Sequence, residues 1–188
     1  MQTANAVVMA QRFIKPKLLT ASLVVDATAG NGKDTLFLAD STPNTTVVWA
    51  FDIQAQALTK TNELLTKHKL ADKVHLVLDS HAHMHQYIKQ PVDAAMFNLG
   101  YLPGGDHEVS TSSETTIQAV SQTLQLLRPE GLITIVAYPG YEHGRVELQD
   151  ILHYFTSLSQ KEFTVACWSI VNQKNSPPIL YLIEKNEE

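Results

Sequence analysis

The sequence predicts an α/β fold in which helices cover both faces of a seven-stranded, mostly parallel sheet with an antiparallel last strand. Three features predict it: apolar runs rich in β-branched residues, helical patterns between those runs, and a final connection too short for a helix. Strands covered on both faces are nearly continuous apolar runs, and strands that alternate with helices form parallel sheets through right-handed crossovers. We expect one domain over residues 1–188, with a helical segment at residues 1–20 packed on the core.

The expected strands are short apolar runs, and the expected helices repeat apolar residues every three or four positions. In chain order, we expect strands at Ser22–Ala27, Thr46–Asp52, Val74–Leu78, Ala94–Leu99, Leu132–Tyr138, Phe163–Val171 and Ile179–Glu184. We expect helices at Ala6–Ile14, Asp34–Ala39, Ala55–His68, His81–Lys89, Ser113–Leu127 and Val146–Ser159. Pro129 and Gly131 are typical of the end of a helix. Only Asn172–Pro178 separates the last two strands, so these strands must pair as an antiparallel hairpin.

The composition is that of a globular protein in a reducing compartment. With 188 residues, of which 44% are hydrophobic and 18% charged, the chain can bury a sizeable core, which excludes disorder and fibrous repeats. The lone Cys167 cannot close an intrachain disulfide. No apolar run approaches the ~18 residues of a membrane span, and the first cations follow the first apolar stretch, the reverse of a secretory signal. We expect a cytoplasmic protein with no membrane partner. The net charge of −5 argues against broad nonspecific binding to nucleic acid but allows a local basic patch.

A glycine-rich turn, residues 26–34, directly follows the first expected strand. Gly30 and Gly32 allow a sharp turn and a close approach of the backbone to a ligand, and the helix that follows offers unpaired N–H groups. Asp26 and Asp34 flank the turn, which suits a cationic ligand better than a pyrophosphate.

Two phosphate-binding motifs fit this turn poorly. A P-loop requires glycine at position 27 and Ser or Thr at position 34, where this sequence has Ala27 and Asp34. A dinucleotide-binding loop requires a third glycine at position 35, where this sequence has Thr35. A tight turn that binds no ligand remains the alternative.

Polar residues also end the second and third expected strands. Asp52, followed by Gln54, can accept both hydroxyls of a ribose, and Asp79, Ser80 and His81 can meet the edge of an adenine. One aspartate at a strand end is more often a helix cap. Aspartates at the ends of three consecutive strands, together with the glycine turn, point instead to an adenosine without phosphates, which means S-adenosylmethionine. With an antiparallel last strand, this arrangement is characteristic of Rossmann-like class I methyltransferases.

Five blocks of residues, at positions 26–35, 51–54, 79–82, 97–106 and 171–178, carry a resemblance to a known family. The chain resembles the small bacterial “putative rRNA methylase” family, whose members include a tRNA 5-aminomethyl-2-thiouridine methyltransferase. The resemblance implies an S-adenosylmethionine-dependent enzyme that methylates the aminomethyl nitrogen of the wobble uridine, position 34, in the anticodon stem-loop of a tRNA. It implies cofactor contacts at Asn31, Asp52, Gln54, Ser80 and His81.

Two positions depart from related patterns. Thr28 stands where class I methyltransferases often have a first glycine, a change that the family tolerates. Pro139 and Tyr141 stand where family members more often have histidine, which leaves the catalytic role of this loop open.

Asn98 lies at the end of the fourth expected strand, Ala94–Leu99, where amino-methylating enzymes place the start of an Asn/Asp-Pro-Pro-Tyr/Phe motif. Methyl transfer is an in-line displacement, so the nitrogen lone pair must face the methyl carbon at roughly 3 Å. The Asn98 amide oxygen can accept an N–H and orient that lone pair, and Tyr101 can stack on a flipped-out base. The alternative is that Asn98 caps the turn and Tyr101 packs in the core.

An amine is largely protonated at neutral pH and must lose a proton before it attacks. Asp106, His143 and Tyr101 are the candidate acceptors, and the sequence does not rank them. Desolvation and orientation alone could also suffice.

His81, His83 and His85 suggest a metal site, but on a helix the middle histidine lies opposite the other two. We expect no metal. His83 and His85 are expected on the helix surface.

An RNA substrate would dock on the rim through residues 101–113, 138–145 and 172–178. The cations that could contact its phosphates are Arg12, Lys15, Lys17, Lys33, Arg145 and Lys174. A homodimer is compatible with the sequence. Alternative functions are a methyltransferase for rRNA or for a small-molecule amine, and a non-catalytic nucleotide-binding or assembly protein on the same fold.

Overall fold

The computed structural model describes residues 5–99, 112–140 and 142–187, apart from the side chains of residues 142–147. Its strands are β1 Leu23–Asp26, β2 Val47–Asp52, β3 Val74–Leu78, β4 Val92–Asn98, β5 Leu127–Ala137, β6 Phe163–Trp168 and β7 Ile179–Lys185. Its helices are α1 Ala6–Leu18, α2 Lys33–Ser41, α3 Ala55–Lys67, α4 Ser113–Leu126 and α5 Glu142–Ser157, with short 3₁₀ helices η1 Ala71–Lys73 and η2 His81–Gln86. Within the described residues, no helix combines the length and apolar character needed to cross a bilayer.

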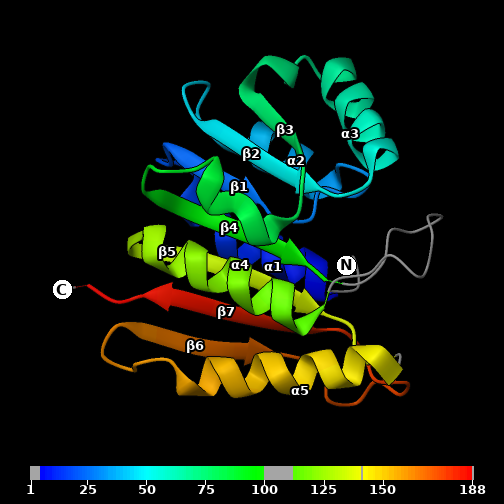
Figure 1. Ribbon diagram of the computed structural model, residues 1–188, viewed down its shortest axis with the longest axis vertical. Coiled ribbons are helices and arrows are strands. Elements are labelled where there is room, and N and C mark those ends of the chain that lie inside the picture. The colour runs from blue at the N-terminus through cyan, green and yellow to red at the C-terminus, as the bar shows by residue number, and fades with distance from the viewer. Residues whose placement is uncertain (1–4, 100–111, 141, 188) are drawn as a thin grey trace.

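The strands form one seven-stranded sheet in the order β3-β2-β1-β4-β5-β7-β6. The pairs from β3 to β5 are parallel, whereas β7 is antiparallel to both β5 and β6. In Figure 1, β7 runs opposite to β4 and β5. This topology confirms the predicted α/β class, with a mostly parallel sheet and an antiparallel final hairpin.

Helices cover both faces of the sheet because alternate strand residues point to opposite sides. On one face, Val24 of β1 and Ala94 of β4 pack against α1, α2 and α3. On the other face, Val25 of β1 and Phe97 of β4 pack against η2, α4 and α5. Figure 1 shows α4 and α5 in front of the sheet and α1 and α2 behind it.

The helix α1 lies across β4, β5 and β7. Its fully buried stripe of Ala10, Ile14 and Leu18 repeats every four residues, and Asn5 caps its first turn by accepting a hydrogen bond from the Val8 N–H at 2.9 Å. Because this apolar spacing continues past residue 14, the helix extends to Leu18, with Pro16 in its last turn, and is longer than the predicted Ala6–Ile14.

Other predicted boundaries also differ: β6 ends at Trp168 rather than Val171, and α5 begins at Glu142 rather than Val146. The expected helix His81–Lys89 is the shorter η2, because the Gln122 side chain from α4 bonds the Ala82 carbonyl at 2.7 Å and so holds this segment against α4. Strand β5 begins at Leu127, five residues before the predicted start, and its first part includes Glu130 in the left-handed conformation (φ 60°).

Candidate active site

The carboxyl ends of β1, β2, β3 and β4 meet at one edge of the sheet, where the glycine turn connects β1 to α2. Gly30 and Gly32 both have positive φ angles, 52° and 79°, a region that favours glycine. A Cβ at Gly32 would lie 2.9 Å from the Thr61 Cα of α3, so the turn fits tightly against that helix. The Thr61 hydroxyl also donates to the Gly30 carbonyl at 3.1 Å.

Asp52, at the end of β2, fixes the turn from its other side. One carboxylate oxygen accepts from the Gly30 N–H and the other from the Gln54 N–H, both at 2.8 Å. Each oxygen keeps a lone pair, and the side chain is only half-buried. Asp52 can therefore hold the turn and accept two hydroxyl hydrogen bonds at once.

Asp26 lies beneath the turn, with no exposed surface. Its oxygens accept from the Thr35 hydroxyl at 2.6 Å and from the Thr28 N–H at 3.1 Å. Burial, with a smaller effect from neighbouring Asp34, raises the pKa of Asp26 from 3.8 to about 7. The structure places this carboxyl as a support of the turn, with both oxygens turned inward.

The residues after β3 divide into two groups. Asp79 accepts hydrogen bonds from His83 Nδ1 at 2.8 Å and from the Tyr87 hydroxyl at 2.9 Å, and the His83 bond is the main cause that holds its pKa below the usual range. The Ser80 hydroxyl accepts from the Ala82 N–H at 3.2 Å and caps η2. Asp79 therefore organises its own segment.

His81 turns in the opposite direction, into the protein, and is 8% exposed. Its Nδ1 lies 3.1 Å from the Ala27 carbonyl. A carbonyl only accepts, so Nδ1 carries the hydrogen and Nε2 is an acceptor. Burial lowers the pKa of His81 to about 4, so the ring is neutral at pH 7.

Two buried acceptor atoms near the turn have no hydrogen-bond partner among the described residues: His81 Nε2 and Asn31 Oδ1. A buried acceptor without a donor is destabilising. These two atoms are therefore available to N–H or O–H donors of a bound molecule.

Asn98, at the end of β4, belongs to a chain of hydrogen bonds that joins four elements. Its Nδ2 donates to Asp34 of α2 at 3.3 Å, and its Oδ1 accepts from the Tyr138 hydroxyl, directly after β5, at 2.9 Å. Gln11 of α1 donates to the other Asp34 oxygen at 2.8 Å. The Asn98 N–H donates to the Thr28 hydroxyl at 2.8 Å, which ties the end of β4 to the glycine turn.

These contacts fix which way the Asn98 amide faces. An ionised Asp34 only accepts, so it selects the amide nitrogen and turns Oδ1 toward Tyr138. Asp34 is buried, and burial raises its pKa, although the bonds from Gln11 and Asn98 act in the opposite direction. The remaining Oδ1 lone pair of Asn98 is fixed in direction before any substrate binds.

The other predicted catalytic residues lie outside this description. Tyr101 and Asp106 are in the segment 100–111, and His143 is in the first turn of α5, where side chains are not described.

The three histidines predicted not to bind a metal diverge, because His81 bonds a carbonyl and His83 bonds Asp79. Among the described residues, no group of three acidic, histidine or cysteine side chains could hold a metal ion.

Sequence reasoning missed several members of this edge. Tyr138 follows the fifth strand, so the strand-end rule that found Asp52 could have found it. Gln11 could not be found in this way, because it reaches Asp34 from a helix that precedes the sheet. Ile53, directly after β2, and Leu78, the last residue of β3, are large apolar side chains that are 54% and 58% exposed at this edge.

The cations predicted to contact phosphate are dispersed. Lys17 pairs with Glu184 of β7 at 2.8 Å, and the Arg12 guanidinium contacts the Met9 sulfur at 3.8 Å on the same helix. Lys33 instead lies at the start of α2, next to the glycine turn.

Known proteins match this chain over most of its length. The family model described as “Putative rRNA methylase” matches residues 48–184. The chloroplastic tRNA (mnm(5)s(2)U34)-methyltransferase of Arabidopsis thaliana is 32% identical over 172 residues. That match covers 86% of this chain and 63% of the plant protein, so the chain spans just under two thirds of this relative's length.

Two solved structures are similar over nearly their whole length. One, a putative rRNA methylase from Clostridium thermocellum, is 44% identical with a TM-score of 0.95, over 98% of this chain and 100% of that one. The other, a putative methyltransferase from Streptococcus mutans in complex with SAH, is 37% identical with a TM-score of 0.89, over 98% and 99%.

Proposed function

This chain belongs to the family described as “Putative rRNA methylase”, as its sequence blocks predicted, and we propose that it is an S-adenosylmethionine-dependent RNA methyltransferase. We propose that its reaction is N-methylation of the 5-aminomethyl group of the wobble uridine in tRNA, which gives 5-methylaminomethyl-2-thiouridine. The activity named for the Arabidopsis thaliana relative supports this substrate. The observation that carries the proposal is the Asn98 amide, fixed at the end of β4 beside the glycine turn.

The residues of the edge fit S-adenosylmethionine as the cofactor. Asp52 offers acceptors for two ribose hydroxyls, and the unpartnered acceptors of His81 and Asn31 suit the N–H groups of an adenine or an amino acid. Ile53 and Leu78 hold exposed apolar side chains at the ends of β2 and β3, where they can cover the faces of an adenine ring. When bound, this cofactor supplies a methyl group on a positively charged sulfonium.

Asn98 selects and orients the substrate nitrogen. Its free Oδ1 lone pair accepts one N–H of the aminomethyl group, which turns the nitrogen lone pair in one direction. Because Tyr138 and Asp34 hold both ends of the amide, this orientation is set before the substrate binds. An ammonium has no lone pair, so the neutral amine is the reactive form. Tyr101, Asp106 and His143 remain the candidate acceptors of its proton.

The test compares the modified nucleosides in tRNA from cells with the gene and from cells without it. Mass spectrometry should show loss of the methylaminomethyl nucleoside and accumulation of its aminomethyl precursor. Wild-type protein should restore the product, and the Asn98→Ala variant should not. Unchanged tRNA nucleosides would overturn the proposed substrate. A methyl group lost from rRNA or from a small-molecule amine would then assign the enzyme to that substrate.

A further inference from the structure

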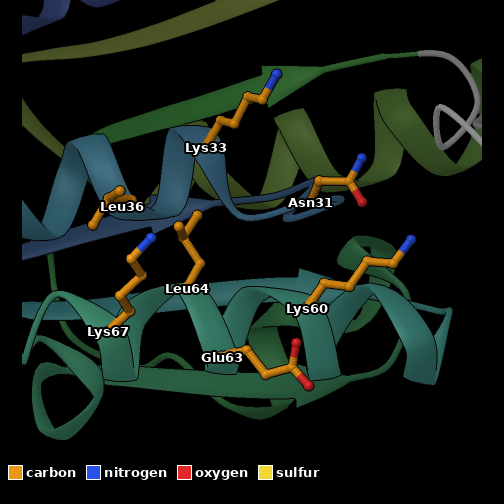
Figure 2. A pocket seen from close by; sticks show the side chains of 7 residues that line it. All are labelled: Asn31, Lys33, Leu36, Lys60, Glu63, Leu64 and Lys67. Carbon is orange, nitrogen blue, oxygen red and sulfur yellow. The ribbon is translucent and has the colours of Figure 1, made fainter.

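A groove of about 600 Å³ runs between α2 and α3, on the helical face next to the glycine turn. Leu36 of α2 and Leu64 of α3 form its apolar part (Figure 2). Lys33 lines the α2 side, and Lys60 and Lys67 line the α3 side. Three lysines thus line one groove in a protein whose net charge is −5, although Figure 2 shows the Lys33 ammonium directed away from α3.

The lysines of this groove outnumber the one acid that lines it, and none of them forms an ion pair with another described residue. The ion pairs found among the described residues involve Lys17, His83 and Arg128, and none of them involves a lysine of the groove. The acid that lines the groove is Glu63, and Figure 2 shows its carboxylate directed away from α2 while Lys67 extends toward α2. An unpaired cluster of lysines in a concave surface is a site for an anion.

The spacing of the lysines favours a chain of phosphates over a single one. Lys60 and Lys67 are two helical turns apart, so their Cα atoms lie about 10 Å apart along the axis of α3. A lone phosphate can contact one of these ammonium groups closely, whereas a nucleic-acid backbone can contact both. The leucines between them suit the apolar face of a sugar better than a second charged group.

The groove is continuous with the candidate active site. Asn31 of the glycine turn lines its end, and Lys33 directly precedes Asp34, whose carboxylate accepts the hydrogen bond from Asn98. We propose that Lys33, Lys60 and Lys67 form a binding site for the backbone phosphates of the RNA substrate, beyond the nucleotide that is methylated. This proposal rests on the proposed function, because it takes the substrate to be an RNA.

The test measures binding of an unmodified tRNA transcript to the whole protein over a series of KCl concentrations. The variant Lys60→Ala/Lys67→Ala should weaken binding by at least about tenfold near 0.1 M salt. It should also reduce the slope of log Kd against log salt by about 1.5, because each lost phosphate contact removes about 0.7 to 0.9. Both lysines are exposed, so the affinity for S-adenosylmethionine and the melting temperature should not change.

The matched control is Lys89→Ala/Lys161→Ala, which removes the same charge at exposed positions outside the groove. An equal loss of affinity in this control, or wild-type affinity and salt slope in the groove variant, would overturn the site. The site would also be overturned if a mononucleotide displaced the tRNA as effectively as an RNA that supplies the same total charge. If the wild type neither binds the transcript nor methylates a tRNA that carries the 5-aminomethyl group on its wobble uridine, the proposed function itself fails. That result is distinct from a groove variant that still binds normally.

Discussion

Replacing Tyr138 by phenylalanine tests whether the orientation of Asn98 controls methyl transfer. The change removes one oxygen, and with it the 2.9 Å hydrogen bond to Asn98 Oδ1, while the ring stays in place. Burial, followed by the nearby Asp34, raises the pKa of Tyr138 above 10, so the hydroxyl is a donor throughout the working pH range. A neutral hydrogen bond contributes about 1 kcal/mol, so losing it should lower kcat by about five- to tenfold.

The assay is steady-state methylation of tRNA, with kcat and KM determined separately and cofactor affinity measured by calorimetry. Because Tyr138 orients Asn98 rather than binding the cofactor, kcat should fall while the Kd for S-adenosylmethionine stays within about twofold. Tyr154→Phe is the matched control, since that phenolic oxygen makes no hydrogen bond among the described residues. Asn98→Ala should lower kcat further, by about a hundredfold, because it removes the amide itself.

Normal kcat in Tyr138→Phe would refute the role of the hydrogen bond. A loss of the same size in Tyr154→Phe would show that the effect is general to the fold. A rise in KM for tRNA with unchanged kcat would assign Tyr138 to substrate binding.

Three further predictions concern the glycine turn and its supports. Asp52→Ala should weaken S-adenosylmethionine binding more than tenfold in calorimetry, about 1.4 kcal/mol or more, and an unchanged titration would refute the ribose assignment. The pKa of Asp26 is raised from 3.8 to about 7, so between these pH values the folded state keeps a proton that the unfolded state releases. The free energy of unfolding should therefore decline as pH rises from about 4 to 7, by up to about 4 kcal/mol. The free energy of unfolding, measured in urea at pH 5 and pH 8, should show this decline in the wild type but not in Asp26→Asn. The same pH dependence in both proteins would contradict the prediction. Gly32→Ala should lower the free energy of unfolding by about 2–4 kcal/mol, because φ is 79° and the added Cβ would lie 2.9 Å from Thr61. Gly140→Ala should be near neutral in the same experiment, because the nearest described atom to the added Cβ would be 3.9 Å away.

The strand ends of this site could be predicted because they follow from local patterns. An apolar run that ends in a polar residue places that residue at the edge of the sheet, and this rule correctly located Asp52 at the end of β2 and Asn98 at the end of β4. The tight glycine turn also followed from local sequence, since Gly30 and Gly32 both adopt positive φ angles.

The partners of these residues could not be predicted, because they come from distant parts of the chain. Asp34 lies 23 residues from Gln11 and 64 from Asn98, and one sequence carries no signal for such pairs. The partners of Asp79 are close in sequence, yet no pattern in the sequence identified them. His83 and Tyr87, on the short segment that follows Asp79, donate hydrogen bonds to its carboxylate, while its predicted adenine contact stays a prediction.

The place of β7 in the sheet has a consequence for how the protein is made. This strand is synthesised after β6 but lies between β5 and β6, so β6 has no partner in the sheet until Ile179–Lys185 has left the ribosome. Until then β5 and the newly made β6 both present unpaired backbone edges, which are open to pairing with other chains. A nonsense mutation before Ile179 would therefore remove two strands from the sheet, because β7 is the strand that joins β6 to the rest of the described sheet.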